Sequence, residues 1–144
     1  VLTINDEEAR LLSGELSLKK AANKILTMGP KYLIIKKGEH GALLFDKNNH
    51  VFSAPALLLE EVFDPTGAGD TFAGGFMGYL SSQEEINWDT MKKAIIAGSA
   101  MASFTVEKFG IERLENLSQS EIDNRINQFR EMTTFDSVIL SSIF

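Results

Sequence analysis

Hydrophobic positions along the chain switch between the spacing of helices and the short continuous runs of buried strands. Residues 32–35 form one such run, Tyr-Leu-Ile-Ile, which predicts a strand covered on both faces. Residues 18–26 instead repeat apolar side chains at i, i+4, i+7 and i+8, the spacing of an amphipathic helix. The polar residues 46–49 separate two further apolar runs, as a hairpin turn does. This order of elements is typical of an α/β fold.

Capping signals indicate where the predicted helices begin and end. Asn5, with Glu8 three residues later, has the spacing of a capping box, and Ser118 begins the last predicted helix in the same way. Gly14 is expected to end the first helix in the left-handed conformation. Asp89 is the expected N-cap of a long helix rich in Ala and Met. The full set of expected elements is strands from residues 1, 32, 42 and 51, a short strand over 61–63, and helices from near residues 5, 17, 68, 89 and 118.

Composition narrows the classes of function. A chain of 144 residues can bury a core, and no repeat or linker divides it, so one domain is expected. Its 14 Lys and Arg against 20 Asp and Glu argue against a protein that coats a nucleic-acid backbone. Cysteine is absent, which excludes disulfides and thiolate metal sites. No apolar run approaches the roughly 18 residues of a membrane span. We therefore expect no nucleic-acid or membrane partner, and a cytoplasmic location.

The segment richest in candidate chemistry is residues 64–72, Asp-Pro-Thr-Gly-Ala-Gly-Asp-Thr-Phe, which runs directly into a predicted helix. Gly67 and Gly69 allow a tight turn and a close approach of the backbone to a ligand. The first amides of the helix have no intrahelical partner and lie at the positive end of the helix dipole. Such a turn is suited to binding an anion.

Asp70 lies inside this turn. A carboxylate there repels a bound phosphate, so its position suggests that it has a function. One task is to accept the proton of an attacking hydroxyl while the amides of Gly67, Ala68 and Gly69 stabilise a transferring phosphoryl group. The alternative is a plain turn in which Asp70 only complements the helix dipole. The segment lacks the Gly-Lys-Ser/Thr ending of a Walker A motif.

Residues 64–72 closely resemble the C-terminal signature of the ribokinase-like, or PfkB, family of carbohydrate and nucleoside kinases. The resemblance implies that Gly67, Ala68 and Gly69 form an anion hole and that Asp70 is the catalytic base. Asp64 and Thr66 match positions that in some members help to hold a monovalent cation such as K⁺. Pro65 stands where many relatives have Thr.

Two other segments match the same family in the expected order. Asn5 and Glu8 match an Asn-x-x-Glu element that organises Mg²⁺ and phosphate through water, although a helix cap alone explains the same pair. Lys36, Gly38 and Gly41 match the strand and turn that lie against the nucleotide phosphates in relatives. Lys36 falls where many members carry a small hydroxyl residue, and a solvated lysine at a strand end is the alternative.

The small residues 97–102 match a region that flanks adenine in relatives. Ala97 and Ala100 are the candidate contacts with the base, and packing of a helix on the sheet explains the same composition equally well.

The resemblance implies a three-layer ribokinase-like (Rossmann-like) α/β sheet flanked by helices, of which residues 1–144 form one domain from the C-terminal portion. The N-terminal half, with the lid and the acceptor site, would be absent, and the chain alone inactive. The implied activity is ATP-dependent phosphorylation of a sugar hydroxyl, with Mg²⁺. A nucleoside kinase or a non-catalytic nucleotide-binding module are the alternatives. The implied partners are a sugar or nucleoside, the N-terminal half, and a second copy in a homodimer of the intact protein.

Overall fold

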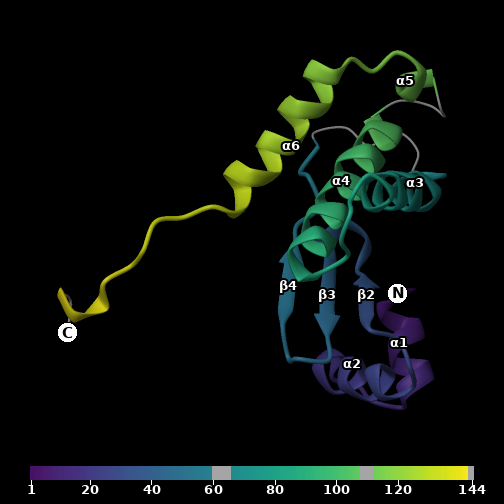
Figure 1. Ribbon diagram of the computed structural model, residues 1–144, viewed down its shortest axis with the longest axis vertical. Coiled ribbons are helices and arrows are strands. Elements are labelled where there is room, and N and C mark those ends of the chain that lie inside the picture. The colour runs from purple at the N-terminus through teal and green to yellow at the C-terminus, as the bar shows by residue number, and fades with distance from the viewer. Residues whose placement is uncertain (60–65, 108–111, 143–144) are drawn as a thin grey trace.

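The computed structural model describes residues 1–59, 66–107 and 112–142 (Figure 1). Its sheet has four strands in the order β1-β2-β3-β4. β1 pairs parallel with β2, while β2 with β3 and β3 with β4 pair antiparallel. β1, β2 and β4 therefore run in the same direction, and their carboxyl ends lie at one edge of the sheet. The strands are β1 (Leu2–Asn5), β2 (Tyr32–Lys36), β3 (Ala42–Asp46) and β4 (Val51–Ala54).

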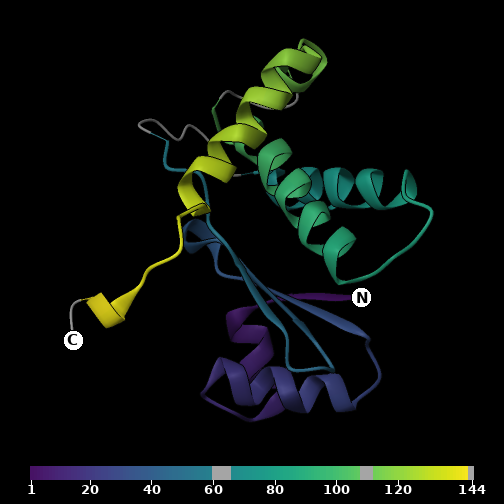
Figure 2. The same cartoon turned by 60° about the vertical axis from the view of Figure 1, so that its left-hand side comes forward.

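Helices cover both faces of this sheet (Figures 1 and 2). α1 (Asp6–Ser13) and α2 (Leu18–Thr27) pack on one face, and α3 (Ala68–Ser81) and α4 (Trp88–Glu107) pack on the other. The predicted three-layer α/β arrangement is therefore confirmed. The remaining elements are the short helices η1 (Gly38–His40), α5 (Glu112–Glu115) and η2 (Leu140–Ser142), and α6 (Gln119–Thr133).

β2 is the centre of the core, as its apolar sequence predicted. Leu33, Ile34 and Ile35 have no exposed surface. Side chains alternate between the faces of a strand, so Leu33 and Ile35 join the cluster under α1 and α2, while Ile34 joins the cluster under α3 and α4. Burying both faces of a strand requires this uninterrupted apolar run.

Glycines allow α3 and α4 to approach closely. A Cβ on Gly98 would lie 2.7 Å from the carbonyl oxygen of Phe72, and a Cβ on Gly75 would lie 3.1 Å from the carbonyl oxygen of Ala97. Neither carbonyl can move without disturbing its helix, so a side chain at either glycine would push the helices apart. These two glycines therefore set the close packing of α3 against α4.

The N-caps predicted at Asn5 and Ser118 are confirmed, and so is the helix expected from near residue 17. Asn5 and Ser118 each form a capping box, Ser17 accepts a hydrogen bond from the backbone of Lys20, and Gly14 ends α1 with a φ of 72°.

The predicted cap at Asp89 is wrong. Asn87 accepts a bond from the backbone of Thr90 through Oδ1 at 3.0 Å, and its own N–H donates to Thr90 Oγ1 at 2.9 Å. α4 consequently begins at Trp88, which places Asp89 inside its first turn, 2.8 Å from Lys93. The expected strand over 61–63 falls outside the described residues.

The C-terminal segment after α6 runs away from the body of the molecule (Figure 2). Its apolar side chains Phe135, Val138 and Ile139 are largely exposed. α6 itself is joined to α4 by Arg125, which donates to Ser103 at 2.8 Å and pairs with Glu107. Within the described ranges, no helix is long and apolar enough to span a membrane.

Candidate active site

The carboxyl edge of the sheet brings the predicted site residues into one region. The strand register aligns Asn5 with Lys36, Lys36 with Ala42, and Ala42 with Ala54 across the sheet. α1 begins at this edge directly after Asn5. The start of α3 also reaches it, because a Cβ on Gly69 would lie 3.8 Å from Lys36 Nζ. In open α/β sheets, ligands bind at this edge.

The turn before α3 has the conformation that the glycines predicted. Gly67 has a φ of 83°, in the left-handed region, and is the N-cap of α3. Its carbonyl oxygen accepts bonds from the N–H of Thr71 at 2.9 Å and from Thr71 Oγ1 at 3.0 Å. The backbone N–H groups at the beginning of α3 are left without intrahelical partners, as required of an anion site.

Asp70 lies in the first turn of α3 and its side chain is exposed. Its carboxylate makes no hydrogen bond or ion pair with any described residue. Both oxygens are therefore available to a ligand. The structure thus places a carboxylate that bonds no described residue directly beside the free amides at the start of α3.

Sequence reasoning missed the residue that supports this turn from α4. Thr105 is buried, with 2% of its surface exposed, and its hydroxyl donates to Thr71 Oγ1 at 3.0 Å. Thr71 in turn bonds the carbonyl of Gly67. These two hydrogen bonds, from Thr105 to Thr71 and from Thr71 to Gly67, connect the turn to α4. No local pattern marks a contact between residues 34 positions apart.

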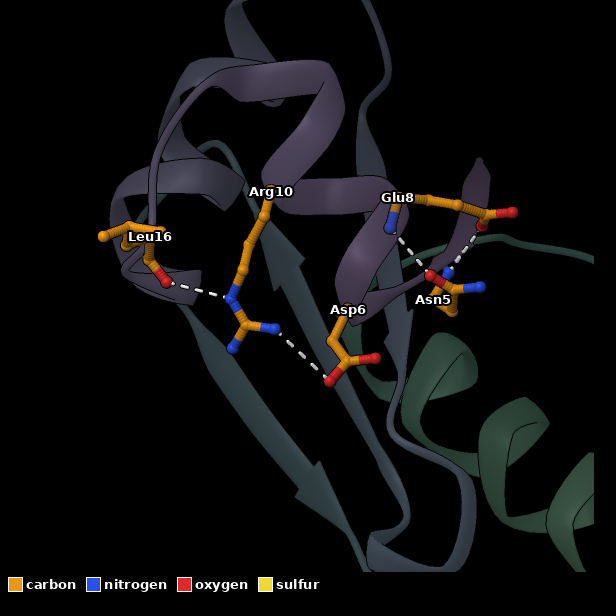
Figure 3. Close-up of polar contacts among 5 residues, drawn as sticks. All are labelled: Asn5, Asp6, Glu8, Arg10 and Leu16. Carbon is orange, nitrogen blue, oxygen red and sulfur yellow. Dashed lines mark hydrogen bonds and ion pairs between the residues drawn. The ribbon is translucent and has the colours of Figure 1, made fainter.

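Asn5 and Glu8 form the reciprocal cap shown in Figure 3. The N–H of Asn5 donates to Glu8 Oε2 at 2.8 Å, and the N–H of Glu8 donates to Asn5 Oδ1 at 2.7 Å. Asp6 points elsewhere, to Arg10 at 3.4 Å, and Arg10 also donates to the carbonyl of Leu16 at 3.0 Å (Figure 3). The pair therefore does form a helix cap, and this cap fixes the direction of the Glu8 carboxylate.

This donor set fits Mg²⁺ held through water. Mg²⁺ keeps several waters and takes one or two carboxylates together with phosphate oxygens, so it needs no protein cage. Glu8 is exposed and uses one of its two oxygens in the cap, which leaves the other for such a contact. Among the described residues, no group of three or more His, Asp or Glu side chains is arranged to hold a metal.

The turn after β2 contains the next predicted pair of glycines. Gly41 has a φ of 88°, and a Cβ there would lie 2.0 Å from the carbonyl oxygen of Ala54, so the fold itself requires glycine. Gly38 has a φ of 57° with open space around it. Lys36 is half-buried at the start of this turn.

The remaining predicted residues are less well placed. Ala100 has no exposed surface and Ala97 is half-buried near Gly75, which favours the packing alternative for Ala100. Thr66 is exposed. Asp64, the other candidate for the monovalent cation, lies outside the described residues.

Comparison with known proteins identifies the family of this site. Residues 1–116 match the sequence model of the pfkB family carbohydrate kinases, and the match includes the sheet, both helix layers and the anion-binding turn. The chain belongs to the pfkB family. The resemblance carried by residues 64–72 is thereby confirmed.

Relatives of this pfkB chain include both sugar and nucleoside kinases. The ribokinase of Staphylococcus aureus is 34% identical over 130 residues, which cover 83% of this chain and 40% of the relative. A cytidine kinase of Thermococcus kodakarensis is 42% identical over 76 residues, covering 52% and 27% respectively. The crystal structure of aminoimidazole riboside kinase from Salmonella enterica, in complex with aminoimidazole riboside and an ATP analog, has a TM-score of 0.67.

That Salmonella kinase is 26% identical, and the similarity covers 92% of this chain but 42% of the neighbour. The pfkB chain thus spans less than half the length of each of these relatives. Since they are kinases, the family membership supports a phosphotransferase.

Proposed function

We propose that this chain is the nucleotide-binding and phosphoryl-transfer half of an ATP-dependent kinase that phosphorylates a sugar hydroxyl. The observation that carries the proposal is the uncommitted carboxylate of Asp70 beside the amides of Gly67, Ala68 and Gly69. A turn that only binds phosphate gives no reason for a carboxylate beside its amides, and the alternative in which Asp70 only complements the helix dipole is tested by the variants below. The ribokinase of Staphylococcus aureus, at 34% identity, supports a sugar as acceptor.

Asp70 acts as general base in this reaction. Its carboxylate accepts the proton of the acceptor hydroxyl as that oxygen attacks the γ-phosphorus of ATP. The amides of the Gly67–Gly69 turn donate hydrogen bonds to the oxygens of the transferring group, whose charge shifts during transfer. Thr105 and Thr71 hold the turn in place, which reduces the reorganisation needed during the reaction.

Metal and nucleotide are held by the neighbouring segments of the same edge. Asn5 and Glu8 would hold Mg²⁺ through water, and the metal would neutralise charge on the ATP phosphates. Lys36, Gly38 and Gly41 would lie along the phosphates, and Ala97 near the adenine. Asp64 and Thr66 would hold a monovalent cation such as K⁺.

The acceptor site belongs to the remainder of the protein under this proposal. The chain spans 40% of the Staphylococcus aureus ribokinase, so residues outside it would choose the acceptor. A nucleoside kinase is the second candidate, since the 42% identical relative from Thermococcus kodakarensis is a cytidine kinase. ATP-dependent turnover of the full-length protein with ribose or with cytidine would distinguish the two.

The variant Asp70→Asn in the full-length protein tests the role of the base. Loss of general-base catalysis is expected to lower kcat by about 10²–10⁴-fold. Thermal stability should be unchanged, because the side chain is exposed and has no described partner. Steady-state kinetics with MgATP and the best acceptor measure the first effect, and thermal unfolding the second.

Asp89→Asn is the matched control for this experiment. Asp89 is also an exposed acid in the first turn of a helix, but it pairs with Lys93 away from the site. If both acids only complement helix dipoles, the two variants will show the same small change in stability and full activity. That result would rule out Asp70 as the base. ATP binding by a wild-type protein that phosphorylates no acceptor would favour the non-catalytic module.

A further inference from the structure

The ammonium group of Lys36 lies beside the turn that begins α3. Lys36 is the last residue of β2, and its Nζ is 3.8 Å from the position that a Cβ on Gly69 would occupy. The positive charge at the end of β2 and the free backbone amides at the start of α3 thus border the space beside Gly69.

Lys36 has no counter-charge in the described structure. It is half-buried, and its side chain makes no hydrogen bond or ion pair with any described residue. A partly buried ammonium loses part of its hydration. An anion that binds in place of the lost water stabilises the charge. The chain has 20 acidic residues, and Lys93 does pair with one of them. A charge without a partner among the described residues therefore favours an anionic ligand at Lys36.

The fold does not explain why residue 69 is glycine. Its φ is outside the left-handed region, unlike that of Gly67. A methyl group at Gly69 would meet only Lys36 Nζ among the described atoms, at ordinary van der Waals distance. Alanine is also the better helix former. Among the described atoms, the space beside Gly69 is therefore open to a ligand, and folding does not require it to be open.

We propose that Lys36 is a catalytic residue whose ammonium contacts the transferring phosphoryl group in this space. The proposal rests on the phosphotransferase function above and deepens it, since family resemblance implied only a nucleotide contact at this position. The acceptor oxygen forms a bond to the γ-phosphorus, and the bond from that phosphorus to the β–γ bridging oxygen breaks. ADP leaves with the electron pair, and Asp70 takes the hydroxyl proton.

Lys36 takes no part in the proton transfer. Its charge offsets the repulsion between Asp70 and the incoming phosphate, and it stabilises negative charge on the phosphoryl and leaving oxygens. Because this stabilisation is greatest in the transition state, Lys36 contributes to kcat more than to ATP binding.

The test compares Lys36→Met, Lys36→Arg and the control Lys47→Met in the full-length protein. Lys47 is an exposed lysine of the β3–β4 turn, at the other end of the sheet. We expect Lys36→Met to lower kcat at least tenfold with the KM for ATP within threefold, and Lys36→Arg to recover part of the loss. Affinity for MgADP should stay within threefold, while affinity for MgADP with aluminium fluoride, a mimic of the transferring group, should fall at least tenfold.

Three results would overturn the proposal: a kcat of Lys36→Met within threefold of wild type, a raised KM for ATP with unchanged kcat, or equal weakening of both ADP complexes. If Lys36→Met fails to fold, the variant Gly69→Ala tests the proposal instead. Its methyl group should reduce kcat at least tenfold without lowering the melting temperature, and full activity would refute the proposed space. An active Asp70→Asn variant defeats the proposed function itself, whereas an inactive one beside a fully active Lys36→Met defeats only the role of Lys36.

Discussion

Two aspartates at opposite ends of the sheet show how differently this fold treats the same side chain. Asp46, at the β3–β4 hairpin, has 8% of its surface exposed and accepts three hydrogen bonds. They come from the N–H groups of Asn48 and His50, at 2.8 and 3.0 Å, and from the His50 ring, at 2.8 Å. Asp70, at the start of α3, is exposed and bonds no described residue. The fold bonds both oxygens of Asp46 and, among the described residues, neither oxygen of Asp70.

The comparison separates groups that build the fold from groups that are available to a ligand, and the glycines divide in the same way. Gly98 and Gly75 leave room for the contact between α3 and α4, and Gly41 leaves room for β4. Gly69 leaves room that no described backbone fills. Location at the carboxyl edge therefore does not by itself separate the two groups, because Gly41 also lies there and the fold requires glycine at that position.

Gly41→Ala is expected to give the largest loss of stability. A Cβ would overlap the carbonyl oxygen of Ala54 at 2.0 Å, and the backbone conformation, with φ 88° and ψ −148°, is accessible almost only to glycine. The backbone strain alone costs about 1–3 kcal/mol, and relief of the overlap requires β4 to move. We expect a loss of more than about 3 kcal/mol in denaturant unfolding of the full-length protein.

Gly38→Ala is the control, because Gly38 has an ordinary left-handed conformation with open space around it. Its loss should be roughly 1 kcal/mol. Equal losses for the two variants would show that the close contact with Ala54 does not determine the choice of glycine at residue 41.

Asp46→Ala should have the next largest effect on stability. The change leaves the N–H groups of Asn48 and His50 without their acceptor, which costs about 1–3 kcal/mol. Turnover should be unchanged, since the hairpin lies at the end of the sheet away from the site. Asp70→Ala is the opposite case, with stability within about 0.5 kcal/mol of wild type and turnover lost. A variant of Asp46 that folds stably but is inactive would break the comparison.

The pH dependence of the Asp46 contribution has a defined sign. Burial alone would raise the pKa of Asp46, but the bonds from His50 and Asn48 outweigh burial and hold that pKa below its ordinary value. A depressed folded-state pKa adds stability that is complete above the unfolded-state value, about 3.9, and is lost as the pH falls through the folded-state pKa. The stability difference between wild type and Asp46→Asn should therefore shrink below about pH 4 in denaturant titrations.

Local signals predicted the parts of the fold and site that depend on neighbouring residues. The caps at Asn5 and Ser118 and the left-handed Gly67 each follow from a few adjacent residues. The cap of α4 was predicted at the wrong residue because Asn87 and Asp89 are both competent caps, and the reciprocal bond with Thr90 decides between them. The approach of Lys36 to Gly69 depends on packing between distant segments, which no local spacing encodes.

Gly74→Ala is the smallest expected effect and the sharpest check on the argument from glycine. Gly74 lies in α3, five residues after Gly69, and no described atom lies within 4 Å of a Cβ placed there. It is exposed, so a methyl group would meet solvent and reduce only the freedom of the unfolded chain. We expect a gain of about 0.5–1 kcal/mol in unfolding experiments and no change in kcat.

Gly69→Ala should likewise not destabilise the protein, yet it should lose turnover, because an ammonium group and free amides face the space that its methyl group fills. If Gly74→Ala lost turnover to the same extent, open space at a glycine of α3 would carry no information about the ligand, and the distinction between the two glycines would fail.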